Sequence, residues 1–399
     1  VAGVGYFTDT SGSAFNVTLP ASPSAGAVIA VADYANNWGT NAVTLLRNGS
    51  NIEGAASDFI CNQSGAAITF VYVDATKGWV ATDTGNSNDA FGQTFIVATG
   101  GTITCCGSCK IHTFTGPGTF TVSSVSGCTS LNEISYAIVA GGGGGGGQEG
   151  SGGGGAGGYR ETKSPNTPYT TSPLDGYSTP GNRITVTATG FPIAVGGGGA
   201  GGPVGTPPQK GGTGVASSAF GLTAAGGGGG GTHPTPACGP GVNGGSGGGG
   251  GARFNFAGGT GNTPPVTPSQ GNNGGNSAPS PTPSTIDSGG GGGGATAVGA
   301  NAGDNQGGAG GAGAASSITA ASVTRSGGGG GGIDPSSPGP AGAGGAGGGG
   351  AGGPSGSTGN AGTVNTGGGG GGSGTNASGS AQGGAGGSGI VIIRYKFQT

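Results

Sequence analysis

The chain has 399 residues, of which 111 are glycine and only 6% are charged, far below the charged fraction of an ordinary globular domain. Its net charge of −3 provides no electrostatic basis for binding nucleic acid or an anionic membrane surface. No run of about 18 apolar residues occurs, so no membrane insertion is expected.

Residues 1–98 are predicted to form a small all-β module. Residues 15–19 alternate apolar and polar side chains and stop at a proline, which is typical of a strand. Further strands are predicted at residues 27–32, 42–46, 67–73 and 79–82. The pairs Asn48-Gly49 and Lys77-Gly78 predict tight turns, and no segment has a helical period of useful length.

Residues 99–140 are predicted to form a second β segment, a hairpin connector. Residues 110–114 and 119–122 have strand patterns and flank the turn sequence Gly116-Pro117-Gly118. The apolar residues 134–140 lead directly into the first glycine run.

The six cysteines are an even set, and their pairing is left open. Cys105, Cys106 and Cys109 lie just before the predicted hairpin, but no second Cys/His pair has the spacing of a metal site. We therefore predict disulfides or unreacted thiols here, and no metal. The other cysteines are Cys61, Cys128 and Cys238. The chain also lacks Met and begins at Val1, from which we expect a processed product or a piece of a longer chain.

Glycine runs organise residues 141–389: 17 of the 111 glycines precede residue 141, and the other 94 lie from residue 141 onward. A glycine run buries no side chain and loses much backbone freedom on folding, so it is ordered only if its backbone bonds to neighbouring runs. The conformation available is the polyproline-II helix, in which seven residues form a rod of about 22 Å. The expected fold is all-β N-terminal modules followed by a polyglycine/polyproline-II helix bundle with protruding loops and little or no α-helix.

Three other interpretations of the glycine runs compete. Collagen requires glycine at every third position, whereas these glycines are contiguous. A flexible Gly/Ser linker gives no reason for runs of similar length. RNA-binding glycine-rich segments interleave arginine and aromatic residues with glycine, and residues 141–399 contain only five arginines.

Segments between the runs supply loops and candidate contact residues. Loops are predicted at residues 203–225, 262–288, 314–326, 333–341 and 354–366. Short strands are predicted at residues 184–187 and 390–397, the latter paired with residues 134–140. Aromatic and arginine side chains dominate interface hot spots. The predicted contact residues are Phe220, His233, Arg253, Phe254 and Phe256, with Tyr169 and Tyr177 as weaker candidates.

Several short sequence segments, taken in their order along the chain, resemble segments of bacteriophage tail fibres, especially those of marine and cyanobacterial phages. The first module contributes LPASPSAGAVIAVADYA, NAVTLLRNGSNIEG and FVYVDATKGW. The later part contributes FIVATGGT, KIHTFTGPGTFTV, SYAIVAGGGGGGG, GAGGYRE, TPGNRITVTATGFPIAVGGGGAGG and GGSGIVIIRY. In architecture the rod bundle is also similar to the glycine-rich adhesin at the tip of T-even-like long tail fibres. It is similar, too, to the glycine-rich extracellular domain of some animal receptor kinases.

The resemblance implies a structural virion fibre protein that binds the host-cell surface and acts outside the cell. The implied partners are a host surface glycan or outer-membrane protein, other tail or baseplate proteins, and further copies of this chain in a homotrimer. Neither nucleic acid nor membrane insertion is expected. Two alternatives remain: a purely structural fibre or coat protein, and a secreted glycine-rich ligand-binding module.

No catalytic constellation is evident in the sequence. There is no phosphate-binding loop and no nucleophile elbow in context, and His112 and His233 lie far apart. Several aspartates crowd the first module, but solvated turn carboxylates explain them more simply than a glycan-cleaving pair. We predict no enzyme activity, no catalytic residue and no cofactor.

Overall fold

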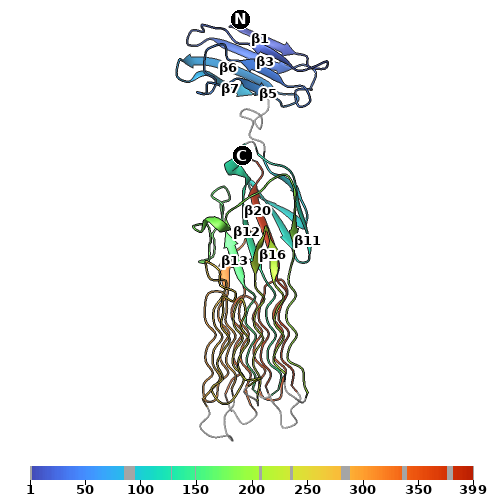
Figure 1. Cartoon of the computed structure of the whole chain (residues 1–399), viewed down its shortest axis with the longest axis vertical. Coiled ribbons are helices and arrows are strands. Elements are labelled where there is room, and N and C mark those ends of the chain that lie inside the picture. The colour runs from blue at the N-terminus through green and yellow to red at the C-terminus, as the bar shows by residue number, and fades with distance from the viewer. Residues whose placement is uncertain are drawn as a thin grey trace. The chain divides into compact units, whose positions relative to one another are not determined.

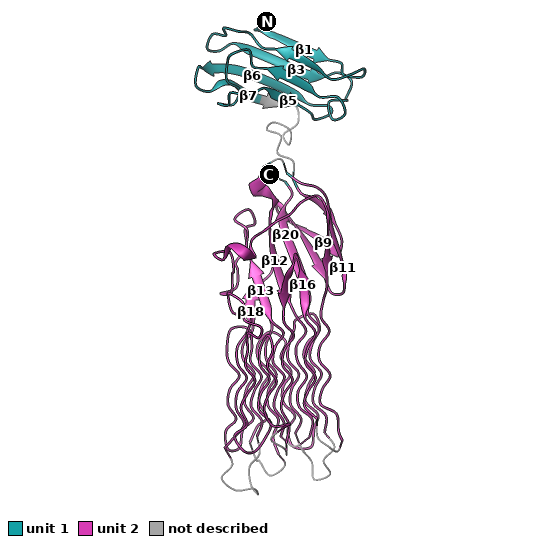
Figure 2. Cartoon of the chain, in the orientation of Figure 1, with its two compact units in different colours: residues 1–95, 126–128, 398–399 teal, residues 96–125, 129–397 magenta. Residues whose placement is uncertain are grey.

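The structure is a computed structural model that describes residues 2–84, 95–126, 128–148, 150–205, 209–233, 237–279, 288–334, 339–374 and 381–398. The described part is all-β, as predicted, with only two short 3-10 helices, η1 (Thr129–Asn132) and η2 (Pro180–Asn182). No helix in these ranges has the length and apolarity needed to cross a membrane. The chain divides into two compact units (Figure 2): unit 1 contains residues 1–95, 126–128 and 398–399, and unit 2 contains residues 96–125 and 129–397.

Unit 1 contains two sheets (Figure 1), one with the strand order β1-β3-β6-β7 and one with the order β2-β4-β5. Its strands are β1 (Val4–Thr8), β2 (Phe15–Thr18), β3 (Val28–Asp33), β4 (Val43–Leu46), β5 (Phe59–Cys61), β6 (Ala67–Asp74) and β7 (Gly78–Thr84). All five strands predicted in this module are therefore present. The additional strands β1 and β5 were not predicted.

One core of buried side chains joins the two sheets of unit 1. It combines residues of β3 and β6 from one sheet with residues of β4 and β5 from the other. Phe59 of β5 packs edge-on against Phe70 of β6, with ring centroids 5.2 Å apart. Trp38 and Trp79, the only tryptophans, are both fully buried in this core. The two sheets therefore form a sandwich whose interior holds both indole rings.

Asp33, at the end of β3, anchors two loops through its carboxylate. Its Oδ2 accepts hydrogen bonds from the backbone N–H of Trp38 and of Gly65, each at 3.0 Å. Burial would raise the pKa of Asp33, but these bonds, with further ones from Asn37 and Ala35, leave its pKa below the ordinary value. The charged form of Asp33 therefore stabilises unit 1.

Replacing Asp33 with asparagine is expected to make unit 1 less stable at neutral pH and less sensitive to acid. Because the pKa is lowered on folding, the carboxylate contributes stability above its ordinary pKa of about 3.9. That contribution is lost as the pH falls through the lowered value. Tryptophan fluorescence during unfolding measures this directly, since both tryptophans lie in unit 1. Coincident pH profiles for the two proteins would contradict the expectation.

Unit 2 begins with a β region built from two sheets and two small hairpins. The larger sheet has the order β13-β12-β20-β10-β9, with β14 attached to β12; the smaller has the order β15-β11-β8. Strands β16 and β17 form one hairpin, and β18 and β19 form the other. The earlier strands are β8 (Val97–Thr99), β9 (Thr102–Cys106), β10 (Cys109–Phe114), β11 (Gly118–Ser124), β12 (Glu133–Val139) and β13 (Tyr159–Thr162). The later ones are β14 (Ile184–Thr185), β15 (Gly190–Ile193), β16 (Ser217–Ala219), β17 (Leu222–Ala224), β18 (Ala314–Ser316), β19 (Val323–Arg325) and β20 (Ile390–Lys396).

Strand β20 pairs antiparallel with β12, as predicted for the closing strand. Both strands are central and buried on their two faces, which explains their nearly continuous apolar sequences. The hairpin predicted for residues 110–114 and 119–122 is not formed. Although β10 and β11 are consecutive, β10 pairs with β9 and β20, whereas β11 pairs with β8 and β15. The short connection between them turns the chain from one sheet into the other.

The glycine segments of unit 2 extend from the sheets side by side (Figure 1) and bond to one another through their backbones. Along residues 141–147, every third amide donates to the same neighbouring segment, and every third carbonyl accepts from another. The amides of residues 141–147 donate to carbonyls of segments 209–215, 381–387 and 152–155. Their carbonyls accept from amides of segments 199–202, 227–230 and 370–373. One glycine segment is thus surrounded by six others. Its regular backbone bonds replace the side-chain contacts that glycine lacks.

The longer glycine runs, such as 141–147 and 327–332, lie inside this bundle, whereas Gly197 and Gly198 of the shorter run 196–199 are exposed at its periphery. Mixed segments surround the interior runs. All residues of 141–147 are buried. In the mixed segment 341–346, by contrast, Gly342 and Gly345 are buried whereas Ala343 and Ala346 are exposed. Ala346 therefore lies outward. A Cβ on Gly342 or on Gly344 would lie 2.0 Å from a carbonyl oxygen of a neighbouring segment, so only the third position, that of Ala343 and Ala346, is open to a side chain.

Three regions predicted as loops contain such outer segments. In residues 354–366, the amides of Gly359 and Gly362 donate to Gln382 and Ala385 of a neighbouring segment. Residues 209–215 and 271–277 are likewise bonded into the bundle. The loop prediction was wrong here because glycine at every third position does not form a visible run.

Candidate functional site

The glycine segments turn back at the end of unit 2 remote from its sheets, which we call the distal end (Figure 1). Strand β12 ends at Val139 and residues 141–147 lead away from it, so Gly147 lies at the distal end. The Thr232 hydroxyl donates to the Gly147 carbonyl, which brings the turn after residues 226–231 to the same place. Residues 206–208, 280–287 and 335–338 of the predicted loops lie outside the described residues.

Four of the predicted contact residues gather at the distal end: His233, Arg253, Phe254 and Phe256. Arg253 Nη1 donates to His233 Nε2 at 3.3 Å. The rings of His233 and Phe254 are stacked, with centroids 6.3 Å apart, and Phe254 meets Phe256 edge-on at 5.7 Å. We call these four residues the distal cluster. They form a contiguous aromatic and basic group contributed by two turns.

The backbone that carries the distal cluster adopts an unusual conformation. Arg253, Phe254 and Asn255 have φ values of 65°, 58° and 50°, three successive residues in the left-handed region. Such conformations are costly for residues other than glycine and persist where their surroundings enforce them. Here the buried Ser277 does so: its Oγ accepts from the Phe256 amide at 2.9 Å and donates to the Arg253 carbonyl at 3.1 Å.

The two phenylalanines of the distal cluster have different surroundings. The Phe256 ring lies against Gly239, where an added Cβ would come within 2.3 Å of it. Phe256 therefore packs on the bundle and restricts residue 239 to glycine. Phe254 is 60% exposed. The supported turn thus directs one aromatic side chain toward solvent and uses the other as its anchor.

The remaining predicted contact residues lie near the sheets. Phe220, in the β16–β17 turn, packs against Phe120, Tyr136 and Phe191 of the core. Tyr169 is half-buried between two cations, with Lys163 Nζ 5.6 Å and the Arg394 guanidinium 5.3 Å from its ring. Burial raises the pKa of Tyr169. Tyr177 stacks with Arg183 at 4.3 Å. None of these three residues touches the distal cluster.

Glu161 is a buried carboxylate in unit 2 that sequence patterns did not single out. It is 2% exposed and accepts hydrogen bonds from Tyr159 Oη at 2.9 Å, from the Ser172 amide at 3.0 Å and from Ser316 Oγ at 2.5 Å. Arg325 is equally buried, and its Nε and Nη1 atoms have no partner within the described residues. Burial lowers the pKa of Arg325, an effect that Tyr159 and Glu161 oppose. In the sequence, Glu161 and Arg325 stand out only because charged residues are rare in this chain.

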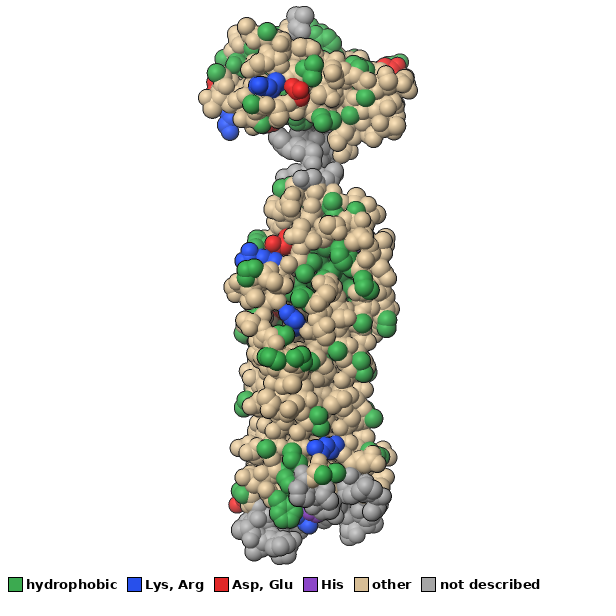
Figure 3. All heavy atoms as spheres, viewed as in Figure 1, with side chains coloured by type: hydrophobic (Ala, Val, Ile, Leu, Met, Phe, Trp, Pro, Cys, Tyr) green, Lys and Arg blue, Asp and Glu red, His purple; other side chains and the backbone are tan. Residues whose placement is uncertain are grey.

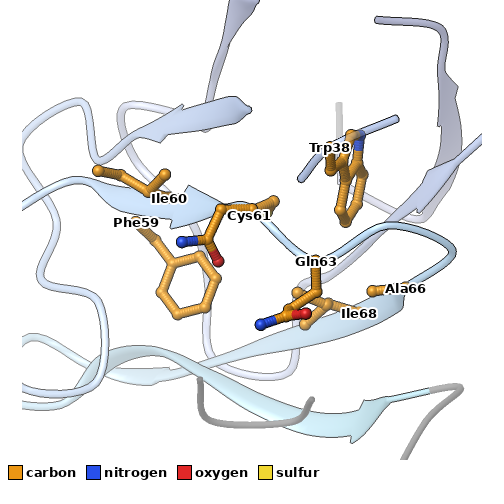
Figure 4. A pocket seen from close by; sticks show the side chains of 8 residues that line it. Trp38, Phe59, Ile60, Cys61, Gln63, Ala66 and Ile68 are labelled. Atoms are coloured by element: carbon orange, nitrogen blue, oxygen red, sulfur yellow. The ribbon is translucent and has the colours of Figure 1, made fainter. Parts of the chain in front are cut away.

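Two small cavities are too narrow for a ligand. The first, in unit 1, lies between Trp38, Phe59, Cys61 and neighbouring side chains (Figure 4) and has a volume of about 20 Å³. The second, beside Glu161, has a volume of about 10 Å³. Each offers room for about one water molecule.

No group of His, Cys, Asp and Glu in the described ranges is arranged to hold a metal ion. His112 is buried in the core, where its Nδ1 donates to the Gly100 carbonyl at 2.7 Å and its Nε2 faces Tyr395 Oη at 3.1 Å. Cys61, Cys105, Cys106, Cys109 and Cys238 are free thiols in the structure. Burial raises the pKa of the Cys61 thiol to about 12, which keeps it protonated and unreactive.

In a comparison with protein families, residues 113–396 match a family described as a glycine-rich domain. The chain belongs to this glycine-rich domain family. The matched region begins in β10 and ends with β20, so it includes most of unit 2 and the distal cluster. No curated protein matches the chain.

Proposed function

We propose that this glycine-rich domain protein is a structural attachment protein of the phage tail-fibre type. In this proposal its distal end contacts the host-cell surface. The observation that carries the proposal is the distal cluster: an exposed Phe254 beside Arg253 and His233, on a turn held in a left-handed conformation by Ser277. Aromatic and arginine side chains held in one orientation are typical of interface hot spots because little entropy is lost on binding.

We further propose that the glycine segments are polyproline-II helices and that their bundle is a rigid support for the distal turns. A polyproline-II helix has three residues per turn and no internal hydrogen bonds. Both properties are consistent with the three-residue period and with the bonding of each segment to its neighbours. Figure 3 shows few charged side chains along the visible face of unit 2. Specific recognition is therefore expected from the turns and not from a charged flank.

The proposed setting follows from the tail-fibre resemblance. It is a virion fibre outside the cell, assembled as a homotrimer and joined to other tail or baseplate proteins. The host partner is a surface glycan or an outer-membrane protein. No catalysis, cofactor, nucleic-acid binding or membrane insertion is part of the proposal.

Replacing Phe254 with alanine is expected to reduce adsorption of the particle to its host by about tenfold or more, the effect of losing one hot-spot aromatic. Adsorption kinetics on host cells measure this. Val364→Ala is a matched control, because Val364 is 67% exposed but lies near the sheets, beside the segment that starts at Gly367. The thermal stability of both variants should equal that of the parent.

The Phe256→Ala variant distinguishes a residue that contacts the host from one that supports the turn. Since Phe256 packs on Gly239, this variant is expected to lose stability together with adsorption. Unchanged adsorption in the Phe254 variant, with the fold intact, would remove the distal cluster from host binding. It would favour a purely structural fibre or coat protein, in which the distal side chains only cover the bundle.

A further inference from the structure

A larger groove lies on the β region of unit 2, between the loop 100–101 that joins β8 to β9 and the turn 115–117 that joins β10 to β11. Its volume is about 310 Å³, within the range of small-ligand sites. None of its lining residues belongs to the distal cluster or to the Glu161 site. The groove is therefore a separate feature of the molecule.

Four threonines line this groove, which we call the threonine groove. Thr102 of β9 and Thr113 of β10 are directly opposed across their strands, and Thr115 and Thr119 contribute from the turn and from β11. Thr102, Thr115 and Thr119 are exposed, and Thr113 is half-buried. The hydroxyls of all four make no hydrogen bond with any described residue. They are thus available as donors and acceptors to a ligand.

The threonine groove is formed in advance of any ligand. Its floor includes Phe114, which is 4% exposed and fixed in the core. A Cβ on Gly100, whose φ is 109°, would lie 2.1 Å from the Thr119 carbonyl oxygen, so the loop and the start of β11 touch through their backbones. The buried His112 also donates its Nδ1 proton to the Gly100 carbonyl at 2.7 Å. On the other side, a Cβ on Gly118, next to the turn 115–117, would lie 3.3 Å from the Phe114 ring. The core therefore holds the loop 100–101 and supports the start of β11.

The chemistry of the threonine groove selects the class of ligand. It is lined by no charged residue, so an ionic ligand would lose hydration without gaining a partner. A purely apolar ligand would cover four hydroxyls and leave them without hydrogen bonds. A ligand with many neutral hydroxyls and an apolar C–H face satisfies both the threonines and the aromatic floor. We propose that the threonine groove binds a neutral oligosaccharide.

Titration of the full chain with neutral hexasaccharides tests the proposal. The probes are maltohexaose, cellohexaose and mannohexaose, with hexagalacturonate as an acidic comparison, and binding is measured by calorimetry and by backbone amide NMR shifts. We expect saturable binding of at least one neutral hexasaccharide, with shifts at residues 100–102 and 113–119. Thr102→Val/Thr113→Val, which keeps side-chain shape and strand preference, should weaken that binding by about tenfold or more.

Control variants show whether a loss of binding comes from the threonine groove itself. Thr121→Val alters an exposed threonine of β11 outside the groove and should bind as the parent does. Thr115→Val, in an exposed turn, serves as a second test if the double variant does not fold. Phe254→Ala should leave sugar binding unchanged, so the threonine groove and the distal cluster are judged separately. Failure of all neutral probes to bind, binding of the acidic probe alone, or full affinity in the groove variants would overturn the proposal.

Discussion

Replacing Gly330 with valine is expected to lower the free energy of unfolding of unit 2 by about 3 kcal/mol or more. Overpacking an ordinary core costs about 1–3 kcal/mol, and side chains there can move aside. In the glycine bundle the obstacle is backbone: a Cβ on Gly330 would lie 2.0 Å from the carbonyl oxygen of Gly342. Gly229→Val should behave alike, since its Cβ would lie 1.8 Å from the carbonyl oxygen of Gly211. Relief of either clash must break hydrogen bonds between segments.

The matched control is Ala346→Val, at an exposed position of an outer segment, for which we expect a change within about 0.5 kcal/mol. Differential scanning calorimetry measures the unfolding of unit 2. Tryptophan fluorescence follows unit 1 in the same samples and should not change. Equal melting temperatures for the parent and both glycine variants would mean that the segments are not packed as the structure shows.

Replacing Glu161 with alanine is expected to destabilise unit 2 by about 3–5 kcal/mol, the cost of removing one partner from a buried charged group. Three hydrogen-bond donors would lose their acceptor, among them the Tyr159 hydroxyl. The buried Arg325 guanidinium would also lose the charge that opposes its desolvation.

A second substitution isolates the charge effect. Arg325→Met removes the buried guanidinium while keeping an apolar side chain of similar length. If Glu161 and Arg325 interact, Glu161→Ala/Arg325→Met will be less destabilised than the sum of the two single variants. Strict additivity in chemical denaturation would show that Glu161 acts through its hydrogen bonds alone.

Strands in this chain could be predicted where side-chain alternation or an apolar run was long enough. The strands β3, β6, β12 and β20 were found in this way, and the β12–β20 pairing followed from their matching apolar character. Pairing was not predictable where a short turn joins two sheets. The connection between β10 and β11 has the composition of a hairpin turn, but β20 occupies the edge of β10 that a hairpin would need.

Contiguous glycine predicted the interior of the bundle but not its periphery. A central segment meets neighbours on all sides and requires glycine throughout. An outer segment such as 341–346 has one open position in three, so side chains such as Ala343 and Ala346 interrupt its glycines and no long run forms. A search for the three-residue period of the glycines would have identified the outer segments.

The sequence predicted which types of residue form the candidate site, but not which individual residues belong to it. The rule that aromatic and basic residues mark contact surfaces selected the distal cluster, and it also selected Phe220 and Tyr169, which the core holds. Composition alone does not separate these groups, because both contain aromatic residues in turns. Ser277, which supports the turn at Arg253, had no sequence signal, and neither did the threonine groove.

The β12–β20 pairing also restricts how the bundle can grow or shrink. The chain leaves the β region after β12 and returns to it in β20, and these strands are direct neighbours. Each segment reverses the direction of the one before it, so an even number is needed for the last to arrive where the first departed. Descendants of this protein should therefore gain or lose segments as outgoing and returning pairs. A single segment added or deleted would leave β20 at the wrong end of the bundle, without its partner strand.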